Sequence, residues 1–497
     1  MARTVWVLGD QLNRRIGALA DARPGEDRVL LVESRAKLDG RRHRQRTHLV
    51  VAALRRFATE LEAAGFEVDH RRAPTLLAGL AAHRRERRPD EVVATEPNSW
   101  AARAVLGREG VTTVRSNQFL CHPDEFAAWV AGRGSRRLRM EDFYRWQRAR
   151  LGYLMDGDDP AGGRWNFDDQ NREPPPKEAN PWPTPVRSAL DDVDREVLDA
   201  IGPEGFGADP EGWWPTSRRQ ALARLRHAVD VVLPMFGPHE DVIVERSWHV
   251  AHTLLSPPLN VGLLLPGEVA DAAEAAYRDG RVPIASAEGF VRQVIGWREY
   301  VWGTYWHGMP GYDEQNALEA HAPLPVAFRV PGRTRMRCVQ QAVEGLHDRG
   351  WVHHIQRLMV FANLSTLAGV EPREVVRWMT DSFVDGDEWV MLPNLIGMGL
   401  HADGGRMATK PYVSGGRYLD RMTDHCRGCA YDPTKRVGER ACPFTTLYWD
   451  FLDRHRERFA RNARMAQAVR GLDRLADLPE VRARAVEIRQ GLRAGTV

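Results

Sequence analysis

Near the N-terminus, the apolar run Val5-Trp-Val-Leu8 is followed directly by Gly9-Asp10-Gln11. Three later runs are equally short and apolar, at Val29–Val32, Val92–Ala94 and Thr112–Val114. Short apolar runs bounded by turn residues are typical of strands that are buried on both faces. We therefore predict a strand at each of these positions.

A helix is predicted over Arg46–Gly65, between two of these strands, and Gly65 is suited to end it. Strands that alternate with helices favour a parallel sheet covered on both faces, whose ligands bind beyond the carboxyl ends of the strands. Those ends carry Asp10, Gln11 and Glu33. The sequence contains no G-x-G-x-x-G, so a dinucleotide fingerprint is absent. A small-molecule site and polar loop ends without a ligand both remain open.

The remainder of the 497 residues divides into two further parts. After Pro215 the sequence has helical patterns almost throughout and no alternating strand pattern. Before it, Gly162-Gly163 and Pro174-Pro175-Pro176 indicate an irregular connector. We expect a Rossmann-like α/β domain over residues 1–131, a connector over 132–204 and a large all-α domain over 205–497.

The charged residues are nearly balanced, with 70 basic against 67 acidic side chains and a net charge of +3. Only four of the basic residues are lysines, namely Lys37, Lys177, Lys410 and Lys435. Arginine suits paired recognition of carboxylate and phosphate groups, although codon bias in a GC-rich genome also explains its excess. A nucleic-acid partner is therefore permitted but not required.

Apolar segments long enough for a secretory signal or a membrane span are absent from the sequence. Five cysteines in so long a chain do not resemble a secreted disulfide framework. We expect a cytoplasmic protein that does not enter the membrane.

The strongest chemical signal is Cys426-Arg-Gly-Cys429, followed by Cys442. Two thiols at this spacing can reach one metal centre, and Cys338 could complete a four-thiolate site. Cys121 lies apart, in the α/β region. An iron–sulfur cluster, a tetrahedral zinc ion and unligated thiols all remain open on spacing alone.

Ser256 followed by Pro257 is typical of a helix N-cap with proline at the first helical position. Such a helix end exposes backbone N–H groups and favours a phosphate, to which Thr253 could add a hydroxyl. An ordinary capped helix is the alternative.

Arg298 is a charged residue on a predicted apolar helix face. Three apolar residues share that face at helical spacing, namely Val291, Ile295 and Trp302. A buried charge without a partner is costly, so we expect Asp385 or Asp387 to pair with Arg298. The pair could serve a ligand or be purely structural.

His354 is predicted on a similar face, together with Leu358, Phe361 and Ser365, and it follows His353. A partly buried imidazole is well suited to move a proton near neutral pH. A core histidine with satisfied hydrogen bonds is the alternative.

Taken in order, these segments resemble the photolyase/cryptochrome superfamily, specifically its bacterial iron–sulfur branch of prokaryotic (6-4) photolyases and deoxyribodipyrimidine photolyase-related proteins. The resemblance covers nearly the whole chain. It rests on the cysteines and on Val7-Leu-Gly-Asp-Gln-Leu12, His252-Thr-Leu-Leu-Ser-Pro257, Glu288–Tyr300, His353-His-Ile-Gln-Arg-Leu-Met359, Ala402-Asp-Gly-Gly405, Lys410-Pro-Tyr412 and Tyr448-Trp-Asp-Phe451.

The resemblance implies three cofactors. FAD would be held in the helical domain by Thr253, Leu254, Leu255, Ser256, Gln293, Arg298, Asp385 and Asn394. A [4Fe–4S] cluster would be bound by Cys338, Cys426, Cys429 and Cys442. An antenna chromophore, typically 6,7-dimethyl-8-ribityllumazine, would lie in the α/β domain near Asp10, Gln11 and Glu33.

The implied activity is the light-dependent repair of UV-induced (6-4) photoproducts in DNA by electron transfer from excited reduced FAD. The lesion would be flipped out of the duplex into the flavin pocket. His354 would transfer the proton that repair needs, and His353 would support it. Met398 would shape the lesion pocket, and Tyr412 would fill the space that the flipped base leaves. The partner would be UV-damaged DNA, and we expect a monomer.

Three positions depart from the family pattern. Val330 and Met379 replace a tryptophan and a tyrosine of the electron relay, and Met391 replaces a glutamate beside the flavin. Trp378 is kept, and Trp389 offers another relay position. A cryptochrome-like photoreceptor without repair activity and a repurposed flavoprotein are therefore alternatives, and a structural metal protein is a further one.

Overall fold

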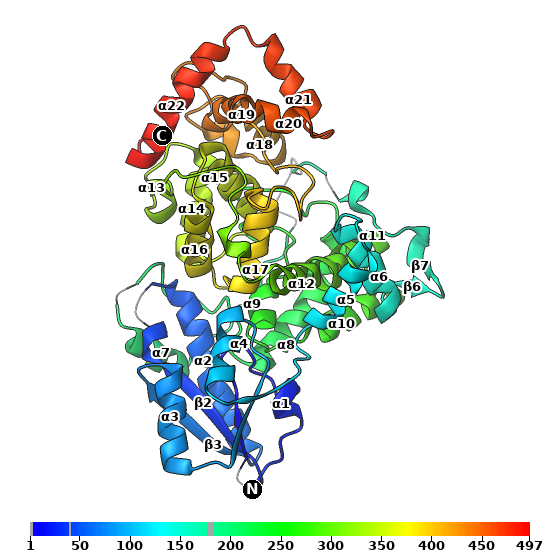
Figure 1. Ribbon diagram of the computed structural model, residues 1–497, viewed down its shortest axis with the longest axis vertical. Coiled ribbons are helices and arrows are strands. Elements are labelled where there is room, and N and C mark those ends of the chain that lie inside the picture. The colour runs from blue at the N-terminus through cyan, green and yellow to red at the C-terminus, as the bar shows by residue number, and fades with distance from the viewer. Residues whose placement is uncertain (1–2, 39–40, 172, 176–181, 204) are drawn as a thin grey trace.

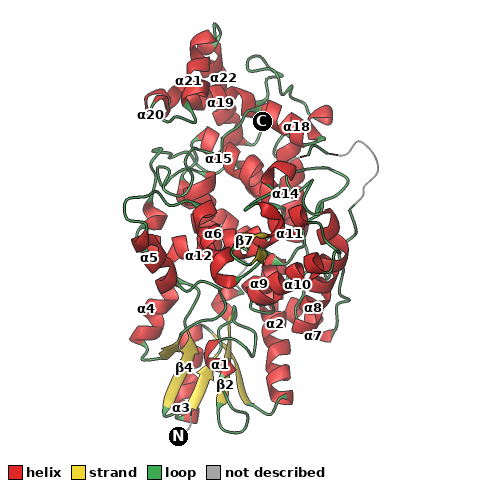
Figure 2. Ribbon diagram, turned by 90° about the vertical axis from the view of Figure 1, so that its right-hand side faces the viewer, coloured by secondary structure: helices red, strands yellow, loops and turns green. Residues whose placement is uncertain are grey.

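The computed structural model describes residues 3–38, 41–171, 173–175, 182–203 and 205–497. A five-stranded parallel sheet lies at one end of the molecule, and helices build the rest (Figures 1 and 2). The strands are β1 (Arg3–Trp6), β2 (Arg28–Ser34), β3 (Glu67–Ala73), β4 (Glu91–Thr95) and β5 (Thr112–Val114), in the order β3-β2-β1-β4-β5. The predicted parallel sheet is confirmed, with Val5 opposite Val29 on one side and Val93 on the other.

Four helices belong to the sheet domain, and eighteen further helices, α5 to α22, follow among the described residues. The early helices are α1 (Gly17–Ala20), α2 (Arg44–Ala63), α3 (Leu76–Arg87) and α4 (Trp100–Arg108). Next come α5 (Pro123–Gly132), α6 (Met140–Leu151), α7 (Asp192–Ile201), α8 (Arg218–His227), α9 (Ser256–Asn260), α10 (Pro266–Arg278), α11 (Ile284–Val291) and α12 (Arg298–Gly308). A short hairpin, β6 (Met155–Asp156) and β7 (Asp159–Pro160), follows α6.

The remaining helices complete the helical part. They are α13 (Val326–Arg329), α14 (Arg337–Arg349), α15 (Asn363–Ala368), α16 (Pro372–Ser382), α17 (Glu388–Pro393), α18 (Gly416–Met422), α19 (Pro443–Arg454), α20 (Arg456–Ala460), α21 (Ala466–Arg470) and α22 (Leu478–Ala494). Among the described residues after Pro215, β structure is limited to isolated bridges. None of the described helices is long and apolar enough to cross a membrane.

Helices cover both faces of the sheet because its central strands are apolar on both sides. Val5 and Val29 pack in one cluster with Leu49 and Phe57 of α2. Trp6 and Leu30, on the opposite face, pack in a second cluster that includes side chains of α3 and α4. This double coverage is what the continuous apolar runs predict.

Two details of the sheet differ from the prediction. Strand β1 ends at Trp6, whereas the apolar run continues to Leu8. Strand β3 was not predicted, because its sequence is mostly charged. It is an edge strand whose Asp69 binds His83, and His83 in turn contacts Thr4 of β1. A buried polar chain thus replaces the apolar contacts that sequence patterns detect.

Four segments of the helical part adopt π-helical geometry, which inserts an extra residue into a turn. They are Ala228–Val232, Arg292–Trp297, Gln356–Ala362 and Asn394–Gly399. Such insertions shift the phase of every residue that follows. Helical spacing read from the sequence therefore fails across them.

The N-terminus of α2 connects the sheet domain to the helical part. His43 caps this helix by accepting the backbone N–H of Gln45 through Nδ1, while its Nε2 lies 2.9 Å from the carbonyl oxygen of His347. The amide of Gln45 donates to the carbonyl of Asp348, and Arg46 pairs with Asp387 at 2.9 Å. Hydrogen bonds and an ion pair therefore fasten the two parts together at this end of α2.

Candidate cofactor and lesion site

Asp385 is the centre of a buried polar network that joins three separate segments. Its carboxylate pairs with Arg357 through both oxygens, at 2.9 and 3.1 Å. The hydroxyl of Ser256 donates to Asp385 Oδ2 at 2.7 Å, and the amide of Asn260 donates to its backbone carbonyl. The structure therefore brings Ser256 and Asp385 together, as predicted for one site.

Two predictions about this network are wrong. Arg298 does not pair with Asp385, because Arg357 occupies that carboxylate. Ser256 is not the N-cap of α9 but its first residue, and its hydroxyl is used on Asp385 instead. Leu255, the residue before Ser256, forms no side-chain cap on α9. Leu254 has a left-handed backbone, with φ of 56°.

Arg298 lies between two aromatic rings. Its guanidinium is 4.5 Å from the ring centre of Phe119 and 4.6 Å from that of Trp389. Burial lowers its pKa to about 10, against the opposing charges of Glu299 and Asp387. Its Nε and Nη2 atoms are buried without a hydrogen-bond partner. These atoms can donate to an anionic or carbonyl-bearing ligand.

The two predicted histidines have different surroundings. His353 is 1% exposed and its ring is stacked on that of His252, with centroids 4.8 Å apart. His354 is accessible to solvent, which corrects the prediction that it lies on the buried stripe. It precedes the π-helical segment Gln356–Ala362, so its phase differs from that of Phe361 and Ser365.

The surroundings of both histidines disfavour the protonated imidazole. Burial lowers the pKa of His354 to about 4, and the charge of Arg357 adds to the effect. Burial also lowers the pKa of His353 well below its usual value, with His252 and His354 contributing. The accessible His354 can contact a ligand, and it would need an anionic neighbour to hold a proton.

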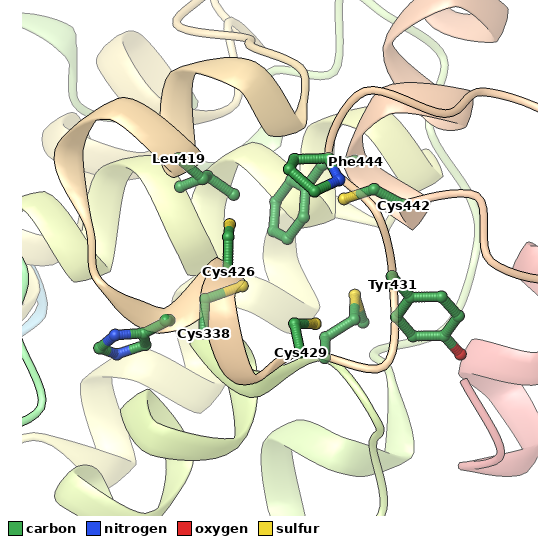
Figure 3. Close-up of a pocket in the computed structure, with 10 residues that line it drawn as sticks. Cys338, Leu419, Cys426, Cys429, Tyr431, Cys442 and Phe444 are labelled. Carbon is green, nitrogen blue, oxygen red and sulfur yellow. The ribbon is translucent and has the colours of Figure 1, made fainter.

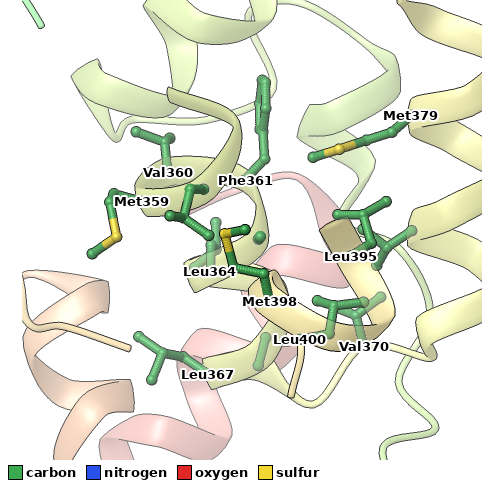
Figure 4. Close-up of a cluster of buried hydrophobic side chains, with 14 of the residues drawn as sticks. Met359, Val360, Phe361, Leu364, Leu367, Val370, Met379, Leu395, Met398 and Leu400 are labelled. Carbon is green, nitrogen blue, oxygen red and sulfur yellow. The ribbon is translucent and has the colours of Figure 1, made fainter. Parts of the chain in front are cut away.

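The remaining predicted flavin and lesion residues lie outside the Asp385 network. Gln293 and Asn394 are half-buried, and the Asn394 amide donates to the carbonyl of Val390. Met398 is 4% exposed and packs in the apolar cluster that Figure 4 shows, near Leu364. Tyr412 is half-buried against the same core.

The four predicted cysteine ligands surround one pocket. Cys338, Cys426, Cys429 and Cys442 line it together with apolar side chains such as Leu419 and Phe444 (Figure 3). Its volume is about 10 Å³. In the described part of the chain, no three His, Cys, Asp or Glu side chains converge closely enough to hold a single metal ion.

Burial disfavours the thiolate form of three of these cysteines, Cys338, Cys426 and Cys442. Burial raises the pKa of Cys426 to about 12 and that of Cys442 to about 11. Burial and the neighbouring thiols raise the pKa of Cys338 well above its usual value. A positively charged centre would be needed to hold them as thiolates.

The predicted antenna residues are placed at the carboxyl end of the sheet, in two different environments. Burial, with the charge of Asp387 second, raises the pKa of Asp10, which accepts a hydrogen bond from Asn98. The carboxylate of Glu33 already accepts hydrogen bonds from protein side chains. Burial opposes its ionisation, but hydrogen bonds from His70 and Arg55 outweigh it and lower the pKa of Glu33 to about 2. Asp10 is therefore the more available of the two carboxylates.

Gln11 is 2% exposed, and its amide donates to the carbonyl of Glu96 at 2.8 Å. Its Oε1 atom is buried without a partner. This oxygen can accept a hydrogen bond from a ligand at the carboxyl end of the sheet.

Trp378 and Trp389 belong to separate aromatic groups. Trp378 is stacked on Phe328, with ring centres 4.8 Å apart, and contacts Phe361 edge to face. Met379 extends toward Phe361 (Figure 4), and Val330 is exposed at the end of α13. The Trp378 group therefore ends in aliphatic side chains at both positions that depart from the family pattern.

The group around Trp389 continues through further tryptophans. The ring centres of Trp389 and Trp302 are 5.7 Å apart, those of Trp302 and Trp306 are 5.5 Å apart, and those of Trp306 and Trp100 are 5.7 Å apart. Trp389, Trp302 and Trp306 are buried, whereas Trp100 is half-buried. We call these four residues the tryptophan series.

Comparison with known proteins gives this geometry a context. The family model described as deoxyribodipyrimidine photo-lyase-related protein matches residues 5–208. A (6-4) photolyase of Agrobacterium fabrum is 39% identical over 483 residues, which is 94% of each chain. The chain belongs to the photolyase/cryptochrome superfamily.

Solved structures of this superfamily share the fold at low sequence identity. A class III photolyase from Agrobacterium tumefaciens is 19% identical, with 99% of this chain and 98% of the other covered and a TM-score of 0.57. A cryptochrome of Synechocystis is 13% identical, with 82% of each chain covered and a TM-score of 0.52.

Membership of the photolyase/cryptochrome superfamily implies an FAD cofactor, and the residues present fit one. Arg298 offers two buried donor atoms without a partner, and His252 and His353 each have one unpaired ring nitrogen. Ser256 and Asp385 lie within one network that also holds Asn260. A polar cofactor can use these groups, which otherwise stay unsatisfied at a cost.

Sequence reasoning missed Arg357, Asn260 and His252. Arg357 follows His353 by four residues within a largely apolar helix. The argument that a charge on an apolar stripe needs an anionic partner, which was applied to Arg298, would also have found Arg357. Asn260 lies in the short helix α9 and carries no comparable signal.

Proposed function

We propose that the chain is a light-dependent DNA photolyase of the (6-4) type. The observation that carries this proposal is the 39% identity to a (6-4) photolyase over 94% of the chain. Accessible His354 beside buried His353 supports it, since repair of this lesion requires a proton donor next to the bound base.

FAD, when bound, supplies the light-driven electron. Arg298, Thr253, Leu254, Leu255 and Ser256 would hold the cofactor, with Gln293, Asn394 and the Arg357–Asp385 pair around it. His354 would donate a proton to the lesion, and the neutral His353, stacked on His252, would fix its position. A lesion phosphate near His354 would raise its pKa toward the range in which the imidazole carries a proton.

The repair test uses purified protein with its flavin fully reduced and an oligonucleotide that contains one (6-4) photoproduct. We expect restored pyrimidines after blue light and none in the dark. An H354A variant should bind the lesion but lose most of the repair. An unchanged lesion after illumination of the wild-type protein would refute repair and leave the cryptochrome-like photoreceptor as the next candidate.

A [4Fe–4S] cluster in the cysteine pocket is part of the proposal. Four thiols that line one pocket match the four cysteine ligands of such a cluster. The apolar walls formed by Leu419 and Phe444 would exclude water from it. An antenna chromophore would occupy the carboxyl end of the sheet near Asp10 and Gln11, with Glu33 fixing the surrounding side chains.

The proposed function also includes an electron route that avoids Val330. The tryptophan series leads from Arg298 to the half-buried Trp100 through rings whose centres are less than 6 Å apart. Trp389 would supply an electron toward the flavin pocket, and Trp302, Trp306 and Trp100 would refill it in turn. A thiol reductant in solution would finally reduce the oxidised radical left on Trp100 and would itself be oxidised, so that each electron passed along the series is replaced. Trp378 would serve as a second, less accessible donor.

A further inference from the structure

A second cleft lies outside the groups described above. It has a volume of about 450 Å³ and is lined by side chains from three regions of the chain. Arg137 comes from the segment before α6, His401 and Thr409 flank the Gly404-Gly405 turn, and Arg458 belongs to α20. Residues between α20 and α21 complete it, namely Arg461, Asn462, Ala463 and Arg464 (Figure 1).

The arginines of this cleft are available to a ligand. Arg458, Arg461 and Arg464 are exposed and form no ion pair within the described part of the chain. Arg137 is also exposed and donates only to the carbonyl of Gly405. By contrast, many other arginines of the protein pair with carboxylates, as Arg456 of the same helix does with Asp473.

The carboxylate of Asp403, next to the Gly404-Gly405 turn, is already hydrogen-bonded within the protein. Asp403 is 6% exposed, and its oxygens accept the backbone N–H groups of Gly405, Arg406 and Met407 and the hydroxyl of Tyr312. Like-charged guanidinium groups that share a cleft repel one another. An anion from outside would relieve this repulsion.

His401 provides an independent indication of a ligand. It is 3% exposed, lines the cleft, and its Nδ1 atom is buried without a hydrogen-bond partner. Its backbone is left-handed, with φ of 52°, a strained conformation that fixes the ring beside Phe459. A buried polar atom without a partner is costly unless a ligand satisfies it.

We propose that this cleft binds consecutive backbone phosphates of DNA next to the lesion. The three arginines without an ion pair, together with Arg137, carry more positive charge than one free phosphate would neutralise. Arginine also binds phosphate through paired hydrogen bonds. The cleft is also linked to the proposed lesion contacts. His401 follows Met398 by three residues. The side-chain amide of Asn462 donates a hydrogen bond to the carbonyl of Thr409, which precedes Tyr412 by three residues. This inference rests on the proposed function.

The test compares the salt dependence of duplex DNA binding for the wild-type holoprotein and a variant with Arg458→Ala, Arg461→Ala and Arg464→Ala. Each lost phosphate contact should reduce the slope of log K against log salt by about 0.9, so by about 2.7 for three contacts. Replacement by lysine should retain most of the slope. Arg108→Ala, at the exposed end of α4, is the matched control and should leave the slope unchanged.

The outcomes separate the two proposals. Wild-type protein that binds no DNA would refute the photolyase proposal and, with it, the partner assigned to the cleft. Wild-type protein that binds and repairs DNA, with the same slope in the triple alanine variant, would overturn only the cleft proposal. Because the replaced side chains are exposed, an unchanged flavin content and melting temperature should accompany the expected loss of slope.

Discussion

The guanidinium of Arg357 and the carboxylate of Asp385 form a two-point ion pair, with Nη1–Oδ1 at 2.9 Å and Nη2–Oδ2 at 3.1 Å. Arg357 also lies 4.3 Å from the ring centre of Phe383, so the pair is held from two sides. Together with the Ser256 hydroxyl, it connects the first residue of α9 to the segment before α17. The pair therefore fixes the relative position of two segments that would hold FAD.

Asp385→Asn should destabilise the protein and reduce its FAD content. The substitution leaves the Arg357 charge without its counter-ion, and removal of one partner of a buried pair costs about 3–5 kcal/mol. Thermal unfolding and flavin absorbance after purification measure the two effects. Asp381→Asn, at a half-buried carboxylate without an ion pair in the described part of the chain, is the control. Equal melting temperatures for the two variants would contradict the assigned role.

Cys338→Ala should abolish iron binding, because the pocket would lose one of its four thiols. Iron and sulfide analysis of anaerobically purified protein should give about four irons per wild-type chain and almost none in the variant. Cys121→Ala is the matched control, since Cys121 is also fully buried but lies outside the pocket. Zinc in place of iron in the wild-type protein would refute the cluster.

Trp302→Phe should slow light-driven flavin reduction by about tenfold or more, which corresponds to about 1.4 kcal/mol in the barrier. Phenylalanine fills the ring stack on Phe119 but is much harder to oxidise. Transient absorption of the tryptophan radical, with a thiol reductant present, measures the effect. Trp378→Phe should have the smaller effect. If the order of the two variants is reversed, electrons travel through Trp378 and the tryptophan series is structural.

Val330→Trp should speed flavin reduction. Val330 is 46% exposed, two residues beyond Phe328, which is stacked on Trp378. An indole at this position would give Trp378 a surface partner. The effect should disappear in the double variant with Trp378→Phe, and Val330→Phe should give no gain. An equal gain from phenylalanine would mean that packing, and not electron transfer, is responsible.

Stability should fall as the pH drops from about 6.5 to about 4, partly through His43. Burial lowers the pKa of His43 to about 4 in the folded protein, whereas in the unfolded chain it is near 6.5. The unfolded state therefore binds the proton first, and the free energy of unfolding falls by up to about 3 kcal/mol across this window. Protonation also removes the Nδ1 lone pair that caps α2.

Unfolding measured between pH 4 and 7.5 checks this prediction. His43→Asn keeps a cap acceptor that does not titrate, so the variant should show a shallower decline with acid. Other buried histidines with lowered pKa, among them His401, will maintain part of the slope. An unchanged slope in His43→Asn would show that His43 does not contribute.

Much of the architecture could be predicted because apolar runs report burial directly. The runs beginning at Val5 and Val29 mark central strands, and the cysteine spacing identified thiols that share one pocket. Strand β3 could not be found in this way, since most of its residues are charged and Asp69 near its centre is buried with His83 as its partner. The partner of Arg298 was wrong for a different reason, because pairing between distant segments depends on competition from Arg357, which sequence spacing does not reveal.

The helix phases were the least predictable feature. The π-helical turns at Arg292–Trp297 and Gln356–Ala362 each add a residue to the helix. No residue type in these segments predicts that insertion. His354 is therefore accessible, although regular spacing places it on a buried face with Phe361. Both turns lie beside residues assigned to the cofactor site, where such insertions are frequent.

The first turn of α2 contacts its neighbours largely through hydrogen bonds to their backbone carbonyls. His43 reaches the carbonyl of His347, Gln45 reaches that of Asp348, and Arg46 reaches that of Thr380. A carbonyl is present whatever side chain its residue carries. Mutations can therefore accumulate at the C-terminal ends of α14 and α16 during evolution without separating the two halves of the molecule. Correlated substitutions among relatives would then leave little trace of this junction.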